Sequence, residues 1–97
     1  MKKAILYVGH NNNTKELEVE KIITITSQHF DGFTTEQVVG YWKGARENTL
    51  KIEIVTDSSD ATIAKLCKEL RVRLNQDAIM LEIVESISHL SAINCNP

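Results

Sequence analysis

Apolar and polar residues alternate with a period of two in several short runs of this 97-residue chain, and such alternation is typical of β-strands with one buried face. The clearest run is 49–55, in which Leu and Ile on one face alternate with Lys and Glu on the other. Further runs predict strands over 4–8, 33–42 and 78–84. Gly40 lies inside the second of these three strands, where it indicates a bulge or a close backbone approach.

Two other segments repeat apolar residues every three or four positions, as expected for helices with one buried face. The segment after Asp57–Asp60 predicts a helix up to Leu74. Asp57–Asp60 itself is rich in N-capping residues, so we interpret its two carboxylates as helix caps and not as a cation site or a catalytic pair. Asn13 and Glu16 have capping-box spacing, so we expect another helix to begin there. It should end at Asp31-Gly32, because glycine suits the left-handed residue that follows many helices.

The resulting order, βαββαβ, predicts an α+β fold, a ferredoxin-like sandwich in which a four-stranded antiparallel sheet carries both helices on one face. We expect a single domain over 1–97 with a weakly patterned C-terminal tail over 85–97. The outer sheet face should be unusually apolar, which favours burial by another subunit or by the tail, and hence a homo-oligomer. The residues expected on this face are Val39, Tyr41, Met80 and Val84.

Composition and charge exclude several classes of protein. The charged share of 25% and the hydrophobic share of 42% are typical of a globular chain, and the net charge of -2 disfavours nucleic acid as a partner. No apolar run approaches the roughly 20 residues that span a bilayer, and the N-terminal run is too short for a signal peptide. We therefore expect a cytoplasmic protein without a membrane partner. Cys67 and Cys95 lack the spacing of a zinc site or a disulfide framework.

Other residues that could carry chemistry have simpler structural interpretations. His10, His29 and His89 are too far apart in sequence for a metal-binding motif, so we predict no metal site and no cofactor. The loop 9–14 could bind an anion at a helix N-terminus. It lacks the glycine pattern of a P-loop, however, and also suits a simple turn.

The best candidate recognition surface lies between the predicted strands 33–42 and 49–55. The end of the first strand and the connector 43–48 bring the only Trp of the chain together with ammonium and guanidinium groups. Aromatic faces beside such cations can stack a base and hold phosphates. The same side chains could instead contact another subunit or lie solvated at a hairpin tip. Residues of the first strand and of the loop that follows it complete the set. The candidate ligand-binding residues are Tyr7, His10, Asn11, Tyr41, Trp42, Lys43, Arg46 and Glu47.

The segments YVGHNN, FDGFTTEQVVGYWKG and ENTLKIEIV resemble those of a family of small, mostly uncharacterised proteins from phages, prophages and gut bacteria, over roughly the first 56 residues. The pattern is Tyr-x-Gly, then Phe-Asp-Gly-Phe-Thr, Gly-Tyr-Trp and Glu-x-Thr-Leu-x-Ile-Glu. The positions that carry it are Tyr7, Gly9, Asn11, Phe30, Asp31, Gly32, Thr34, Gly40, Tyr41, Glu47, Thr49, Leu50, Ile52 and Glu53.

The resemblance implies a phage-type context, in which small cytoplasmic proteins often counter host defence by binding a protein or sequestering a nucleotide signal. The order of elements is also similar to that of the signal-transduction PII proteins. That likeness is of fold only, because their long nucleotide-binding loop is missing here.

These observations favour a non-enzymatic oligomeric protein that binds a small anionic or nucleotide-like ligand in a pocket between subunits. An alternative is a protein-protein inhibitor or adaptor that presents the outer sheet face and the hairpin to a host protein. A third hypothesis is a small hydrolase or isomerase that uses His10 with Glu47.

Overall fold

The computed structural model describes residues 1–85, so the predicted tail lies outside the described residues from position 86 onward. Within them, the elements follow the predicted order βαββαβ. They are β1 (Lys2–Val8), α1 (Val19–Ser27), β2 (Thr34–Trp42), β3 (Ala45–Thr56), α2 (Asp60–Arg73) and β4 (Met80–Val84).

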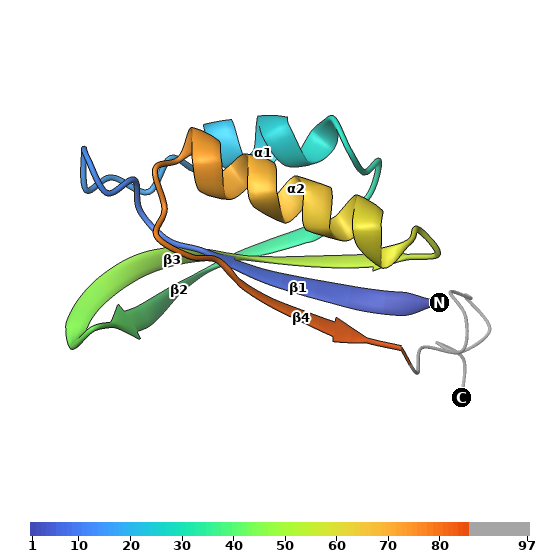
Figure 1. Ribbon diagram of the computed structural model, residues 1–97. Helices are drawn as coiled ribbons and strands as arrows, with labels where there is room; N and C mark the ends of the chain where they lie inside the picture. Colours follow the sequence, from blue (N-terminus) through green and yellow to red (C-terminus); the bar gives the residue numbers. More distant parts are fainter. Residues whose placement is uncertain (86–97) are drawn as a thin grey trace.

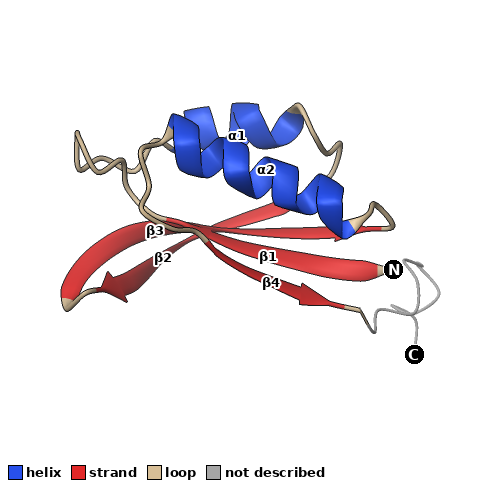
Figure 2. Cartoon of the chain, viewed as in Figure 1, coloured by secondary structure: helices blue, strands red, loops and turns tan. Residues whose placement is uncertain are grey.

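A four-stranded sheet forms one layer and the two helices form the other (Figure 1). The strand order is β2-β3-β1-β4, and every neighbouring pair is antiparallel. Both helices cover the same face of the sheet, as Figure 2 shows. The predicted fold class, an α+β ferredoxin-like sandwich, is confirmed.

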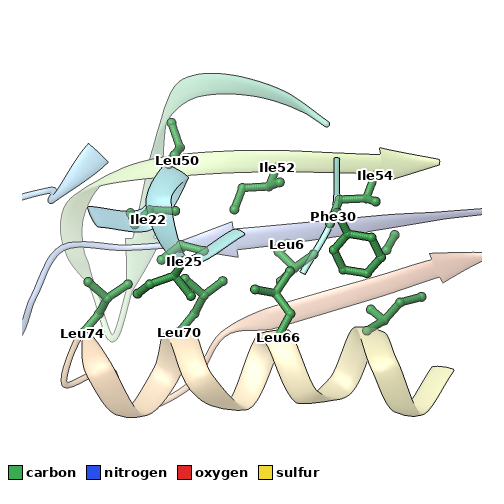
Figure 3. Packing of buried hydrophobic residues seen from close by; sticks show 13 residues of the cluster. Leu6, Ile22, Ile25, Phe30, Leu50, Ile52, Ile54, Leu66, Leu70 and Leu74 are labelled. Atoms are coloured by element: carbon green, nitrogen blue, oxygen red, sulfur yellow. The ribbon is translucent and has the colours of Figure 1, made fainter. Parts of the chain in front are cut away.

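The hydrophobic core fills the space between the sheet and the helices (Figure 3). Every second residue of 4–8 in β1 and of 50–54 in β3 is fully buried, as the alternation predicts. The apolar stripes of both helices supply the opposing side chains. The largest buried side chains include Leu6, Ile22, Ile25, Leu50, Ile52, Ile54, Leu66, Leu70 and Leu74. Burying a side chain of this size contributes about 1.5–3 kcal/mol, so this layer is the main source of stability.

The first helix begins later than the capping-box spacing predicts. α1 starts at Val19 and not beside Asn13, and its N-cap, Glu18, makes no side-chain capping bond. The reason lies in Asn11, whose Oδ1 accepts hydrogen bonds from the backbone N–H groups of Asn13 (2.8 Å) and Thr14 (3.4 Å). Its Nδ2 donates to Glu18 Oε1 (2.8 Å). An ordered loop therefore satisfies these amides in place of a first helical turn.

The second helix begins inside the predicted capping cluster, but its cap is a serine. Ser59 Oγ accepts a hydrogen bond from the backbone N–H of Thr62 (3.2 Å). Asp60 lies in the first turn, where its Oδ1 is 2.7 Å from Lys2 Nζ, and Asp57 Oδ1 lies 3.7 Å from the N-terminal ammonium. The two carboxylates thus form surface ion pairs, and their interpretation as caps is wrong.

The hairpin between β2 and β3 has a shorter turn than predicted. Only Lys43 (φ 52°) and Gly44 (φ 79°) connect the strands, and both have the positive φ of a two-residue type I′ turn. The predicted connector 43–48 is wrong, because β3 extends over most of it. Arg46 and Glu47 are therefore strand residues.

The register of β2 against β3 decides which face each hairpin residue occupies. Val39 and Tyr41 lie opposite Asn48 and Arg46, on the side of the sheet that carries Leu50. The prediction that Val39 and Tyr41 lie on the outer face is wrong, because their partners in β3 alternate in phase with the buried residues of that strand. Both side chains are nevertheless exposed, because the end of the hairpin projects beyond the helices (Figure 1).

The outer face, the sheet surface away from the helices, carries Met80 and Val84 as predicted. Met80 lies opposite Tyr7 in the β1–β4 register, and Tyr7 belongs to the face of β1 that the core does not use. Gly40 lies on this face in an unbroken register, so the predicted bulge is absent. The alternative, a close approach, is present: a Cβ on Gly40 would lie 3.1 Å from the side-chain Oγ1 of Thr49.

Candidate functional site

A hollow of about 800 Å³ opens on the outer face. In this region the β2–β3 hairpin bends away from the helix layer (Figure 1). Residues from all four strands and from the connection between α2 and β4 line it. Its volume is within the range of small-molecule sites. The lining includes Tyr7, Glu36, Val38, Trp42, Glu47, Thr49, Lys51, Asp77 and Met80.

Strand register explains why several of these side chains meet. Tyr7 lies opposite Lys51 in β3 and opposite Met80 in β4, and Lys51 in turn lies opposite Glu36 in β2. Directly opposed residues of antiparallel strands share a face. The four side chains therefore form one row across the sheet, which gives the hollow an aromatic ring, a thioether and two opposite charges.

Negative charge predominates in the lining. The carboxylates of Glu36, Glu47 and Asp77 accompany a single ammonium group, that of Lys51. Lys51 Nζ also lies 3.1 Å from Glu53 Oε1, and this hydrogen bond raises the pKa of Lys51 and lowers the pKa of Glu53. Part of the lysine's positive charge is thus balanced outside the lining. The hollow consequently suits a neutral or cationic ligand better than an anion.

Trp42 forms the aromatic end of the hollow near the hairpin tip, and its side chain is 50% exposed. Tyr41 borders the hollow, but register turns its side chain to the other face of the sheet. Lys43 Nζ lies 5.8 Å from the centroid of the Trp42 ring, within the range of a cation–π contact. An exposed aromatic ring at the mouth of a hollow offers a surface on which a base can stack.

Glu47 lies at the edge of the hollow, in contact with the loop after β1. Its Oε2 is 3.6 Å from His10 Nε2, and both side chains are only 20% exposed. A Cβ built on Gly9 would overlap the Glu47 carboxyl group, so the carboxylate can lie here only because Gly9 has no side chain. The structure therefore brings together His10 and Glu47, the pair considered for a hydrolase or isomerase.

Gln76 holds the backbone of this loop in place. Its buried side-chain Nε2 donates hydrogen bonds to the carbonyl oxygens of Gly9 (3.2 Å) and His10. Gln76 was not among the predicted residues, because 66 positions separate it from His10 and no local pattern signals the contact.

The structure brings only some of the sequence-predicted binding residues to the hollow. Those that line it are Tyr7, Trp42 and Glu47, and Tyr41 borders it although register turns its side chain to the other face. His10 lies behind Glu47, and Lys43 belongs to the hairpin turn. Asn11, only 6% exposed, uses its side chain to hold its own loop. Arg46 lies on the opposite side of the sheet by register.

Several lining residues were not among the predicted ligand contacts. Glu36 and Lys51 alternate with residues of the opposite face, so the period of two could have placed them on the outer face. Asp77 follows a helix, and only the path of the chain after α2 brings it here.

No helix within 1–85 is long and apolar enough to cross a membrane. In the same part of the chain, no group of three or more His, Cys, Asp or Glu side chains could hold a metal ion.

No protein-family model and no curated protein matches the chain, but solved structures do. A phage SAM lyase in its apo state is similar with a TM-score of 0.72 and 22% identity, over 94% of this chain and 89% of that one. A phage SAM lyase in complex with S-methyl-5'-thioadenosine is similar with a TM-score of 0.59 and 25% identity, over 87% of this chain and 80% of that one. A DUF3240 family protein from Shewanella baltica has a TM-score of 0.62 and 15% identity, over 94% of each chain.

The likenesses at 22% and 15% identity show a shared fold. They cover most of both chains, so the shared fold extends over most of this chain. The neighbours include proteins from phages, as the sequence resemblance implies, and one of them was solved with a small nucleoside ligand.

Proposed function

We propose that this protein binds S-adenosylmethionine in the hollow on the outer face and cleaves it, releasing S-methyl-5'-thioadenosine. The observation that carries the proposal is the likeness, at 25% identity over 87% of this chain, to a phage SAM lyase in complex with that nucleoside. The proposal keeps the nucleotide-like ligand expected from the sequence and adds turnover to it.

The chemistry of the lining supports this ligand. The substrate carries a sulfonium cation, which favours a site with more carboxylates than ammonium groups, and Glu36, Glu47 and Asp77 provide that excess. Its adenine ring needs a stacking surface, and Trp42 exposes an aromatic ring at one end of the hollow. The same charges disfavour the anionic ligand that the sequence left open.

The reaction breaks the bond between the sulfonium sulfur and Cγ of the methionine portion. The electron pair stays on sulfur, which becomes a neutral thioether. The remaining four-carbon fragment becomes a stable product in one of two ways: its own carboxylate attacks Cγ, or a base removes a proton from Cβ. Both routes release S-methyl-5'-thioadenosine, so this thioether is the product to measure.

Mass spectrometry of the purified protein incubated with S-adenosylmethionine tests the proposal. We expect the thioether to accumulate above the protein-free rate, and Glu47→Gln to slow it by about tenfold or more. Glu69→Gln is the matched control, because Glu69 pairs with His29 on the helix layer, away from the hollow. If calorimetry detects binding but no product forms, the protein sequesters the ligand without cleaving it, and the proposed turnover is wrong. The absence of both binding and product would overturn the proposal.

The biological role that we propose is the removal of this nucleotide-like cofactor from the host cytoplasm by a phage-type protein, which would act against host defence. Expression in a bacterium should then lower its pool of S-adenosylmethionine. It should also raise the plating efficiency of phage on a strain whose defence requires that cofactor. An unchanged pool together with unchanged plating would contradict this role.

A second candidate function is contact with a host protein through the outer face and the hairpin. The exposure of Met80 (62%), Val84 and Trp42 supports it. A pull-down with the wild-type chain and with Trp42→Ala tests this function. Capture that does not depend on Trp42 would argue against the hairpin as the contact.

A further inference from the structure

Next to the hollow, Gly9, His10, Glu47 and Gln76 form a cluster that joins the loop after β1 to β3 and to the end of α2. Three restraints meet at the Glu47 carboxylate. The bare backbone of Gly9 lies against it, the imidazole of His10 lies 3.6 Å away, and Gln76 fixes the backbone of both loop residues. A surface glutamate would instead sample many rotamers, so these contacts reduce the entropy lost when a ligand meets the carboxylate.

Resting on the function proposed above, we propose that His10 is a positioning residue that holds Glu47 at the edge of the hollow. In that position Glu47 favours a cationic sulfonium nucleoside over its neutral thioether product, and protonation of His10 weakens this preference.

The electrostatic reason is the charge state of the His10–Glu47 pair. With a neutral imidazole, the negative charge of Glu47 is available to a cation in the hollow. With a protonated imidazole, the two side chains form an ion pair, and the attraction for a cationic ligand falls.

The other charged or titratable groups of the hollow are Glu36 of β2, Lys51 of β3, Asp77 of the connection to β4, and the phenols of Tyr7 and Tyr41. Carboxyl, ammonium and phenol groups ordinarily keep one charge state between about pH 5.5 and 8, where imidazole changes its own. We therefore assign the proposed pH effect to His10, whose imidazole is the one that contacts Glu47 in the described cluster.

This arrangement also suits turnover. Cleavage removes the positive charge from sulfur, so the attraction to Glu47 ends at the step that forms the product. A site that prefers the cation therefore releases the thioether and is available for new substrate.

The test measures the affinities of two stable ligands by calorimetry between pH 5.5 and 8. Sinefungin carries a cationic amine near the sulfonium position, whereas S-adenosylhomocysteine is a neutral thioether with the same amino-acid tail. For the wild-type protein at pH 8 we expect sinefungin to bind about tenfold more tightly or better, as a charge-assisted contact provides. This preference should decrease severalfold toward pH 5.5.

Four variants separate the roles. Glu47→Gln should bind both ligands with similar affinity at every pH, and Gly9→Ala should do the same because its methyl group displaces the carboxylate. His10→Gln, which is neutral throughout, should keep a preference that no longer changes with pH. His29→Gln is the matched control: His29 lies 3.3 Å from Glu69 on the helix layer, and its replacement should leave both the preference and its pH dependence unchanged.

Circular dichroism and thermal melting establish that each variant is folded. A preference that survives Glu47→Gln, or a wild-type pH dependence in His10→Gln, would overturn this inference while leaving the proposed binding intact. Failure of the folded wild-type protein to bind either ligand would overturn the proposed function itself.

Discussion

Two asparagines of one loop have roles that differ from the predicted ones, which were a ligand contact for Asn11 and a helix cap for Asn13. Asn11 is buried and hydrogen-bonds to the backbone of its loop and to Glu18, whereas Asn13 is exposed and contributes its backbone N–H to the contact. A side chain that satisfies buried amides is costly to remove, since the amides then lose their partner.

We therefore expect Asn11→Ala to lower the free energy of unfolding by about 1–3 kcal/mol. Asn13→Ala should change it by less than about 0.5 kcal/mol, because no side-chain cap is lost. Urea denaturation of both variants measures the difference. A larger loss for Asn13→Ala would mean that the capping box exists in solution.

Cys67 illustrates how partial burial changes a single group. The thiol packs against the core, and desolvation raises its pKa above the ordinary value. The folded state thus favours the neutral thiol. Its contribution to stability is complete below the pKa of the unfolded thiol and is lost as pH rises through the higher folded-state value.

The alkylation rate of Cys67 should therefore reach half its maximum at a higher pH in the folded protein than in urea. A Cys95→Ser background leaves Cys67 as the only thiol of the chain. Iodoacetamide labelling followed by mass spectrometry gives both profiles. Coincident profiles would show that the thiol is fully solvated in the folded state.

At the scale of elements, the β2–β3 hairpin depends on its two-residue turn. Gly44 has a φ of 79°, a conformation in which a Cβ is strained, and Gly32 has neither a positive φ nor a neighbour within 4 Å of a built Cβ. The two glycines therefore give a matched pair of positions.

Gly44→Ala should destabilise the protein by about 1–2 kcal/mol. Gly32→Ala should be neutral or slightly stabilising, because alanine lowers the conformational entropy of the unfolded chain. For a domain of this size, 1 kcal/mol corresponds to a shift of about 4–8 °C in Tm. Thermal melts of both variants measure this. Equal Tm values would indicate that the hairpin turn does not limit stability.

At the scale of the whole molecule, the outer face raises the question of a second copy. Met80 is 62% exposed and lies with Val84 on β4, an edge strand of the sheet. Exposed apolar side chains beside an edge strand favour association, as the sequence analysis expects for a homo-oligomer.

We predict that the wild-type protein has a mass in light scattering that is a multiple of its 10.9 kDa chain. Met80→Lys should shift it toward the monomer, because a charge opposes burial of this face. Val72→Lys is the matched control, since Val72 is similarly exposed (56%) but lies on α2. A monomeric wild-type protein would contradict the prediction.

The amino-acid sequence by itself determined the order of elements and the core. The alternation in 4–8 and 49–55 and the helical stripe before Leu74 are local patterns, and each of them is fixed by the need to bury one face. The ends of elements were less predictable. The hydrogen bonds of Asn11 formed in place of the predicted cap at Asn13, and the Lys43-Gly44 turn formed in place of the predicted connector 43–48.

The tertiary structure alone decided which predicted residues share a site. Register placed Tyr41 and Arg46 on the face away from Tyr7, and chain path brought Gln76 and Asp77 beside residues of β1 and β3. A contact between residues more than sixty positions apart produces no periodic pattern in the sequence, because the pattern around each residue reflects only the helix, strand or loop to which that residue belongs. The packing of Glu47 against Gly9 and His10 is therefore a property of the folded chain alone.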